Sequence, residues 1–314
     1  MRPFLLILIL LAFVSCNSKK EKQTNETQVK KYHFHNGFAE GTTFSISYES
    51  VEDYNNDIDS VIASFEKILS TYDSLSLISA YNNNQRWMVN NKIFMNFFEK
   101  SKEIHDLTEG AFDITIAPLV NAWGFGFRNK DTISEHLIDS LLQYIGFEKL
   151  RIRNDSLIKS NPHVMMDGNA IAKGFSVDIV GNFLESHGII NYMVEIGGEV
   201  VAKGVNKDNN TWRIGIDKPI EDQGAAQREI QAIVALKDKA LATSGNYRKF
   251  YYKNGLKYSH TIDPTTGRPV THNLLSATVL TKDCMTADAL ATSFMVMGLE
   301  KTKILNVECI KVSY

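Results

Sequence analysis

The stretch 258–270, YSHTIDPTTGRPV, constrains the fold more than any other part of the chain. Pro264 fixes the backbone angle φ and Gly267 can adopt a positive φ, so these residues predict a turn between extended segments. A turn does not require the imidazole of His260 and the carboxylate of Asp263 before it. The stretch is therefore either a polar loop that hydrogen-bonds its own backbone or part of a functional site.

Composition narrows the class of protein. The 314 residues are enough for one large domain or two average ones, and the 44% hydrophobic content is typical of a soluble globular protein. The formal net charge is −2, which predicts no basic surface and argues against a nucleic-acid partner. The three cysteines form no CxxC pair, so a structural zinc site is not expected.

The N-terminus has the pattern of a targeting segment. An apolar run from Phe4 to Val14 is too short to span a bilayer but fits the core of a signal peptide. Cys16 follows the small residue Ser15, and residues 1–16 resemble a bacterial lipoprotein signal in which this cysteine carries the lipid. The alternative is an ordinary signal peptide or a weak anchor. Residues 17–35 are expected to form a flexible tether to a membrane, with the folded part, 36–314, outside the cytoplasm.

Hydrophobic periodicity predicts alternating helices and strands. Apolar residues at helical spacing predict helices within 58–72, 94–104, 137–145 and 171–184, the last capped by Asn169. Alternation and turn residues predict strands or hairpins at 41–48, 87–89, 151–159, 192–204, 212–216 and 230–236. The polar segment 74–84 is expected to be a loop.

An apolar run between Gly110 and Gly126 carries Asp113. A buried carboxylate is costly unless it is paired or hydrogen-bonded, so Asp113 needs either backbone N–H partners or a ligand group. The aromatic residues Trp123, Phe125 and Phe127 are either core or the wall of a pocket for a flat ring.

Two segments present bare backbone that could meet an anion. Asp167 ends an extended segment, and the next helix begins with small residues and Lys173. A helix N-terminus with free N–H groups favours anions, although a plain capped helix would have the same sequence. Ser244 and Gly245 lie at a predicted strand end, where they form either a phosphate contact or a simple turn.

Asp288 and Thr292 are four residues apart near the start of the last predicted helix, so they share one face. A carboxylate and a hydroxyl next to a phosphate site would suit Mg²⁺, which prefers few protein oxygens completed by substrate phosphate and water. Alternatively, Asp288 only favours the helix dipole.

These segments together resemble one family. The ordered blocks GAFDITIAPLVNAWGFG, MDGNAIAKGFSVD, EIGGEV, TSGNY, YSHTIDPTTGRPV and TADALAT resemble those of the ApbE family of FAD:protein FMN transferases, from about Gly41 to Gly298. Position 40 departs from the family pattern, because it is Glu where Met is usual. Family members also usually carry one or two further strands after Gly298, and residues 307–314 are expected to supply a short last strand unless the sequence is truncated.

The resemblance implies a single α+β domain of antiparallel or mixed sheets with flanking helices. It implies that a Ser or Thr hydroxyl of an acceptor flavoprotein, of the respiratory flavin-subunit type, attacks the phosphorus of FAD that stays with FMN, releasing AMP. Mg²⁺ would be held by the Ala170 carbonyl, Asp288 and Thr292, and His260 would act as general base. FAD would contact the following residues: Tyr72, Ala111, Phe112, Asp113, Asp167, Lys173, Ser244, Gly245 and His260.

Two other functions fit the same residues. A Mg²⁺-dependent FAD pyrophosphatase would use water in place of the protein hydroxyl and give FMN and AMP. A lipoprotein that only binds FAD would need neither a metal nor a base, so Asp288, Thr292 and His260 argue against it.

Overall fold

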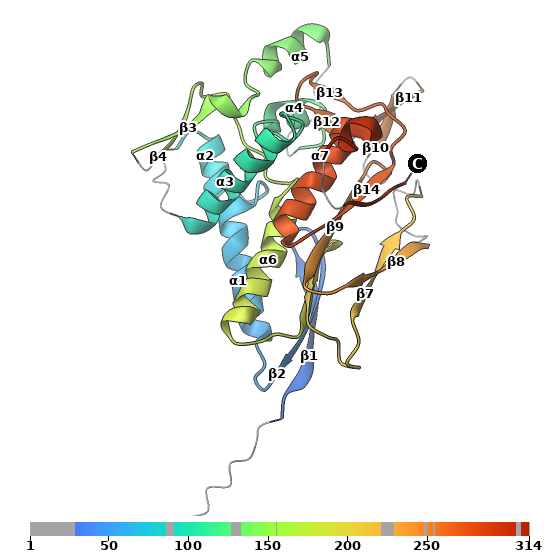
Figure 1. Cartoon of the computed structure of the whole chain (residues 1–314). Coiled ribbons are helices and arrows are strands. Elements are labelled where there is room, and N and C mark those ends of the chain that lie inside the picture. Colours follow the sequence, from blue (N-terminus) through green and yellow to red (C-terminus); the bar gives the residue numbers. More distant parts are fainter. Residues whose placement is uncertain are drawn as a thin grey trace, which may run out of the picture.

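The structure is a computed structural model, and it describes residues 29–85, 91–126, 133–154, 156–220, 229–247, 250–253, 255–305 and 309–313. Its centre is a seven-stranded sheet with the order β1–β2–β5–β6–β9–β14–β15, in which every neighbouring pair is antiparallel (Figure 1). The strands are β1 (Lys31–Ala39), β2 (Thr42–Ser50), β5 (Tyr192–Ile196), β6 (Glu199–Lys203), β9 (Lys239–Gly245), β14 (Ser276–Thr281) and β15 (Cys309–Ser313).

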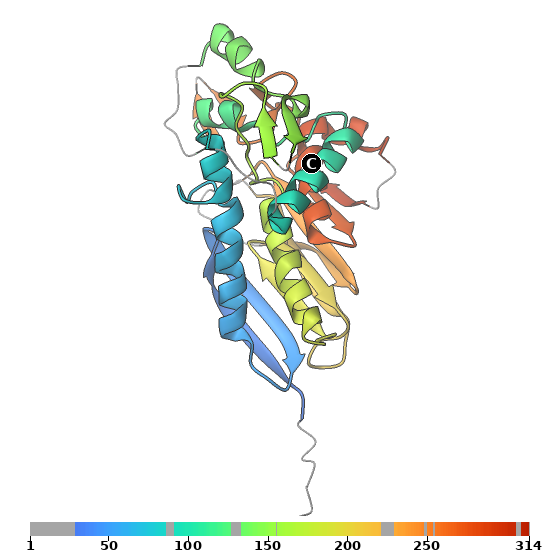
Figure 2. The ribbon, with the colours of Figure 1, turned by 90° about the vertical axis from the view of Figure 1, so that its left-hand side faces the viewer.

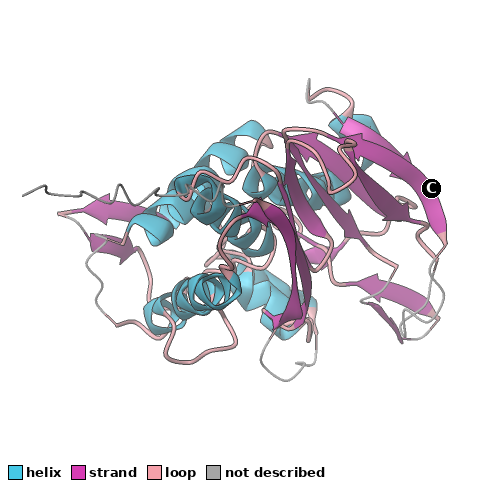
Figure 3. Cartoon of the chain, turned by 90° about the horizontal axis from the view of Figure 1, so that it is seen from below, coloured by secondary structure: helices cyan, strands magenta, loops and turns pink. Residues whose placement is uncertain are grey.

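Long helices cover one face of this sheet (Figures 2 and 3). They are α1 (Asn55–Leu69), α3 (Lys92–Leu107), α6 (Ala172–Ser186) and α7 (Cys284–Thr302). Helices α6 and α7 contact each other and the central strands, while α1 packs against α6. Shorter helices lie near the ends of the long ones: α2 (Leu77–Asn82), α4 (Ala117–Ala122), α5 (Glu135–Leu142) and the 3-10 turn η1 (Phe147–Lys149).

Small two-stranded sheets complete the fold. The β7–β8 hairpin (Trp212–Asp217 and Ile230–Leu236) covers the face of the central sheet that the helices leave open, where Trp212 and Leu236 pack with Val200 and Leu241. The others are β3–β4 (Leu150–Arg153 and Ser156–Lys159), β10–β11 (Phe250–Lys253 and Leu256–Ser259) and β12–β13 (Ile262–Asp263 and Arg268–Pro269).

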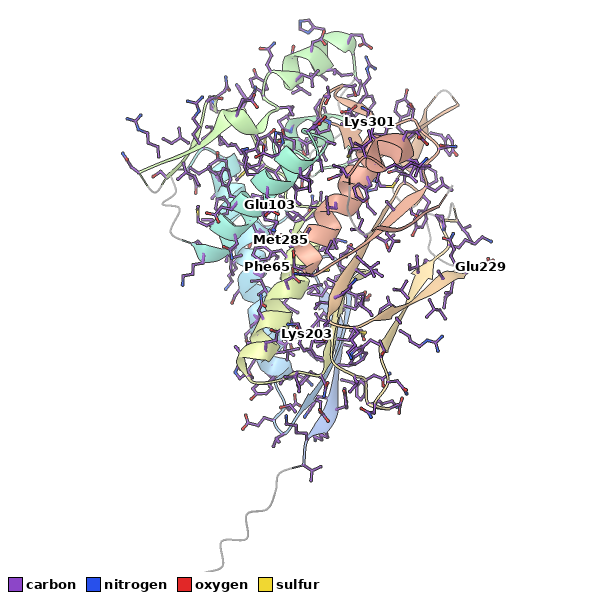
Figure 4. All side chains as sticks on the ribbon, in the orientation of Figure 1. Phe65, Glu103, Lys203, Glu229, Met285 and Lys301 are labelled. Carbon is purple, nitrogen blue, oxygen red and sulfur yellow. The ribbon has the colours of Figure 1, made fainter. Side chains whose placement is uncertain are left out.

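The largest hydrophobic core lies between the helices and the sheet. Phe65 of α1 and Met285 of α7 belong to it, and Figure 4 labels both in the middle of the helical layer. A second core joins β2, β5, α1 and α6 around Ile46, Ile58 and Val194. Because both cores bind α1, α6 and α7 to the sheet, the ends of these elements are held in fixed positions relative to one another.

Most predicted elements are confirmed. The α+β class is correct, as are the strand around 41–48, the helices within 94–104 and 171–184, and the hairpins at 151–159 and 192–204. The predicted last strand appears as β15, which pairs with β14. The predicted strand at 87–89 lies outside the described residues. Within the described part of the chain, no helix has both the length and the apolar character needed to cross a membrane.

Three predictions about local structure were wrong. Segment 74–84 is not a loop, because Ser76 accepts a hydrogen bond from the Ser79 N–H at 3.1 Å and starts α2. Asn169 does not cap α6; the N-cap residue is Ile171, and the Asn169 N–H donates to the side chain of Asp167 at 2.8 Å. Residues 31–35 belong to β1 rather than to the tether, so the folded domain begins before the predicted boundary at 36.

Candidate active site

Two hydrogen bonds hold the turn within 258–270, one from its own backbone and one from Trp123. Gly267 has φ +68°, and its N–H donates to the Asp263 carbonyl at 2.8 Å. The indole Nε1 of buried Trp123 donates to the Gly267 carbonyl at 2.8 Å. Since α4 and the turn are tied together in this way, the residue that enters the turn, His260, is held at a defined place beside Phe125, with ring centroids 6.4 Å apart.

The first turn of α6 is hydrogen-bonded to α7. The Gly174 N–H donates to Asp288 Oδ2 of α7 at 3.0 Å. Gly174 is the third residue of α6, so its N–H is one of the first-turn N–H groups that have no partner inside the helix, and the carbonyl four residues earlier, that of Ala170, lies outside α6. Among the residues that the structure describes, no backbone N–H donates to the Ala170 carbonyl. This leaves a backbone oxygen available at the head of the helix, where the predicted metal ligand lies.

A buried charge cluster surrounds this point. Lys173 Nζ lies 2.6 Å from Glu199 Oε2, and the Glu199 carboxylate is almost fully buried. Burial acts to lower the pKa of Lys173, but the charges of Glu199 and Asp288 outweigh it and hold the ammonium protonated. Burial raises the pKa of Asp288, an effect that Lys173 and the Gly174 N–H only partly offset. The cluster therefore has more carboxylates than cations, and it would be stabilised by added positive charge.

One cavity gathers the predicted residues. Its volume is about 390 Å³, and its wall includes every residue predicted to contact FAD or Mg²⁺. They are Tyr72, Ala111, Phe112, Asp113, Asp167, Ala170, Lys173, Ser244, Gly245, His260, Asp288 and Thr292. Cys16, the predicted lipidation site, lies outside the described residues.

The end of strand β9 and helix α7 both border this cavity, as expected. Thr292 Oγ1 lies 3.5 Å from Ser244 Oγ, so β9 and α7 bring two hydroxyls to the same wall. Asp167 is tied to the run containing Asp113 through its N–H, which donates to the Ile114 carbonyl at 2.7 Å. Segments that are far apart in the sequence thus present hydroxyl, carboxylate and ammonium groups to one space.

Comparison with known families decides the classification. The ApbE family profile matches residues 41–310. The chain belongs to the ApbE family.

Curated ApbE relatives cover most of the chain. A Vibrio cholerae protein named FAD:protein FMN transferase is 40% identical over 83% of this chain and 80% of its own length. The Escherichia coli protein of the same name is 33% identical over 93% of this chain and 86% of its own length. The solved structure of the flavin transferase ApbE from Vibrio cholerae has a TM-score of 0.78 at 39% identity and covers 88% of this chain and 90% of that one. The apo flavinyl transferase ApbE from Pseudomonas stutzeri gives 0.77 at 32%, with 88% of each chain covered.

In this ApbE chain, Asp113 has local partners. Its Oδ1 accepts from the Thr115 N–H at 2.8 Å and from the Thr115 hydroxyl at 2.6 Å, and its Oδ2 lies 3.5 Å from His105 Nδ1. Burial nevertheless raises the pKa of Asp113. The Thr115 N–H and hydroxyl thus provide partners that a carboxylate in this apolar run needs, and the Asp113 side chain also borders the cavity.

Some of the acidic residues in the cavity wall were not predicted from the sequence. Glu40, Glu66 and Glu199 all line it; the resemblance placed position 40 at an edge of the adenine or flavin pocket, whereas Glu66 and Glu199 were not expected there. Glu199 carried a detectable signal, because it is a charged residue at the start of the buried strand β6. The described residues contain no group of three or more His, Cys, Asp or Glu side chains placed to hold a metal. The predicted Mg²⁺ ligands would not form such a group, since Asp288 is their one carboxylate.

Proposed function

We propose that this protein transfers FMN from FAD to a Ser or Thr hydroxyl of an acceptor flavoprotein in a Mg²⁺-dependent reaction that releases AMP. The observation that carries the proposal is the cavity, which combines an oxygen-rich corner at the start of α6 with Lys173 and His260. The names of the curated relatives, FAD:protein FMN transferase, support the same reaction.

The residues present fit a small hard cation. The Ala170 carbonyl takes no backbone hydrogen bond among the described residues, and it borders the cavity together with Asp288 and Thr292. Mg²⁺ favours a few oxygen ligands of this kind, completed by substrate phosphate and water. When bound, Mg²⁺ would supply positive charge against the pyrophosphate of FAD.

Lys173 and His260 would perform the remaining tasks. Phosphoryl transfer depends mainly on positioning and charge neutralisation, and the Lys173 ammonium, held by Glu199, would face the pyrophosphate oxygens. His260 would accept the proton of the acceptor hydroxyl as its oxygen bonds to the phosphorus on the FMN side. The bond from that phosphorus to the bridging oxygen then breaks, and AMP leaves with the electron pair.

The test uses the full-length chain with FAD, Mg²⁺ and an acceptor protein that carries a Ser or Thr flavinylation motif. In-gel flavin fluorescence of the acceptor and AMP release should both require Mg²⁺. His260→Ala should lower labelling at least about a hundredfold, as expected for loss of a general base. His136→Ala, at an exposed position on α5, is the matched control and should leave labelling unchanged.

Other outcomes would reject the transferase. AMP and free FMN without a labelled acceptor would instead support the pyrophosphatase. Bound FAD without AMP under any condition would leave only flavin binding.

We also propose that Cys16 carries a lipid and anchors the domain to a bacterial membrane, outside the cytoplasm, most simply on the periplasmic side. The support is the apolar run and the Ser15-Cys16 pair that follows it. Cells that express the chain should incorporate labelled palmitate into it, and Cys16→Ala should abolish the label. Incorporation that persists in Cys16→Ala would contradict the proposal.

A further inference from the structure

Helices α6 and α7 are hydrogen-bonded to each other in both directions. The carboxylate of Asp178 on α6 accepts two backbone N–H groups from the start of α7, that of Cys284 at Oδ1 and that of Met285 at Oδ2, each at 2.8 Å. In return, Asp288 of α7 accepts the Gly174 N–H at the start of α6. On each helix a donor and the acceptor are four residues apart, so they share one face. The first turn of each helix is therefore held by a carboxylate of the other.

Asp178 is not the N-cap residue of α7. That residue is Asp283, whose side chain accepts the Thr286 N–H at 2.8 Å, as an N-cap normally does. The first N–H groups of a helix have no partner inside it, and Asp178 satisfies two of them from a different helix. Its bonds therefore fix the position of α7 relative to α6, which a cap from the preceding residue cannot do.

The carboxylate of Asp178 is suited to this double contact. An asparagine of the same length would offer one acceptor oxygen and one NH₂ donor, so it could satisfy only one of the two N–H groups. The charge is costly in this place: burial raises the pKa of Asp178 to about 7, the two N–H groups and the charge of Lys100 oppose the rise, and the charge of Asp283 adds to it. The two bonds to α7 thus depend on a carboxylate that its surroundings otherwise disfavour.

Asp178 lies apart from the cavity that gathers the predicted FAD and Mg²⁺ residues. It borders a second cavity of about 380 Å³ between α3, α6, the start of α7 and the central sheet, and among the described residues the two cavities share no wall residue. Three residues of the second cavity are labelled in Figure 4: Glu103, Lys203 and Met285. Asp288 and Thr292, in the second and third turns of α7, border the first cavity. Asp178 can therefore affect them through the position of α7.

We propose that Asp178 is a positioning residue for the proposed Mg²⁺ site: by holding the first two N–H groups of α7, it sets where Asp288 and Thr292 lie relative to the Ala170 carbonyl. Asp178 touches neither FAD nor the metal in this scheme. The inference rests on the proposed function, because it uses the assigned Mg²⁺ ligands. Groups that orient metal ligands change metal affinity when they are replaced, so the effect is expected on metal binding rather than on the reacting groups.

The experiment measures Mn²⁺ affinity of the full-length chain with saturating FAD, from the loss of the free Mn²⁺ signal in electron paramagnetic resonance. Mn²⁺ takes the same kinds of oxygen ligand as Mg²⁺. Asp178→Asn should bind Mn²⁺ about tenfold more weakly, and the Mg²⁺ concentration that gives half-maximal AMP release should rise in parallel. The KM for FAD at saturating Mg²⁺ should stay unchanged. Asp178→Glu keeps two acceptor oxygens, and the second cavity has room for its extra methylene, so it should recover most of the affinity.

Two controls separate position from charge and from stability. Asp283→Asn removes a carboxylate from the same end of α7 but keeps an oxygen that can accept the Thr286 N–H, and it should leave Mn²⁺ affinity unchanged. Ile216→Val removes one methylene from the core under the β7–β8 hairpin, whose described members all belong to strands. It should lower Tm and also leave Mn²⁺ affinity unchanged.

Several results would overturn the inference and leave the proposed function intact. Unchanged Mn²⁺ affinity in Asp178→Asn would show that α7 is held in place without this carboxylate. Equal losses in Asp178→Asn and Asp283→Asn would assign the effect to charge, and an equal loss in Ile216→Val would assign it to stability. An Asp178→Asn chain without a cooperative unfolding transition in EDTA would show that Asp178 is needed for the fold itself. If the unaltered chain binds neither FAD nor Mn²⁺, the proposed function fails as well.

Discussion

The Gly174 N–H donates to Asp288 Oδ2 at 3.0 Å, and this one bond joins the start of α6 to the first turns of α7. It satisfies a helix N–H that has no partner within its own first turn, and it orients a buried carboxylate. It also leaves the Ala170 carbonyl without that N–H. The packing of the two helices and the proposed metal site are therefore parts of one arrangement.

Gly174→Ala should disrupt this arrangement. A Cβ at position 174 would lie 2.3 Å from the Cys284 carbonyl oxygen and 2.7 Å from Asp288 Cβ, and the carbonyl belongs to the backbone, which cannot move aside. We expect a loss of several kcal/mol of unfolding free energy, as for other overpacked sites, measured by urea denaturation. Gly215→Ala is the matched control, because its added Cβ meets only Ile230 at ordinary contact distances. Equal stability of the two variants would contradict the close packing described here.

Asp288→Asn should have opposite effects on the metal-free and metal-bound protein. Burial raises the pKa of Asp288, so its ionised form is unfavourable without a cation, and the neutral amide should raise Tm by about 2 °C or more in EDTA. Asparagine can still accept from the Gly174 N–H. The rise in Tm that Mg²⁺ and FAD produce in the unaltered chain should be lost. Differential scanning fluorimetry measures both effects, with the exposed Asp139→Asn as control. A normal response of Asp288→Asn to Mg²⁺ would remove Asp288 from the ligand set.

Periodicity and turn residues were sufficient to predict most of the fold. The helices at 94–104 and 171–184 and the hairpin at 192–204 have strong local patterns, and each formed. Helix α2 was missed because it has only six residues and polar residues flank it, and it forms since Ser76 caps it and Ile78 and Tyr81 are buried. Tertiary packing outweighs local propensity there.

Some features of the site could be predicted from the sequence and others could not. The positions of His260, Asp288 and Thr292 at the cavity could be predicted, because each lies in a short segment that resembles a block of the family. The pairing of Lys173 with Glu199 could not, because it joins the start of α6 to the start of β6 and depends on how the helix packs on the sheet. The partners of Asp113 are local, since one hydroxyl and one backbone N–H of Thr115 bond to it, and backbone N–H partners were one of the two alternatives expected from the sequence.

Lys173→Met should destabilise the metal-free protein more than the double variant Lys173→Met/Glu199→Gln. Removing the ammonium leaves the Glu199 carboxylate, only 4% exposed, without its cation and close to Asp288. Loss of one partner of a buried pair costs about 3 kcal/mol or more, and the cost falls when the second charge is also removed. Urea denaturation of the single and double variants in EDTA measures the difference. Additive effects of the two substitutions would indicate that the pair does not interact.

Glu40 should make stability depend on pH. Its N–H donates to Glu66 Oε1 at 2.8 Å, and its own Oε1 is buried without a hydrogen-bond partner. Burial raises the pKa of Glu40 from 4.5 to about 7; Ser176 and Lys173 oppose the rise, and the charges of Glu66 and Asp288 add to it.

The sign of the pH effect follows from that rise. In the unfolded chain Glu40 loses its proton near pH 4.5, whereas the folded protein holds the proton until about pH 7. The unfolded state therefore binds fewer protons in this window, and stability falls as pH rises from about 4.5 to about 7 and is level above it. The full loss from this group is up to about 3 kcal/mol.

Glu40→Gln removes the titration and keeps the shape of the side chain. The difference in Tm between Glu40→Gln and the unaltered chain, both in EDTA, should be small at pH 4.5, grow in favour of the variant up to about pH 7 and then stay constant. Glu109→Gln is the matched control, because Glu109 also has a positive φ, 51° against 53° for Glu40, but is exposed. A Tm difference between Glu40→Gln and the unaltered chain that does not change across this pH range would contradict the prediction. It would mean that the Glu40 carboxylate reaches solvent in the folded protein and that its charge destabilises the metal-free protein little.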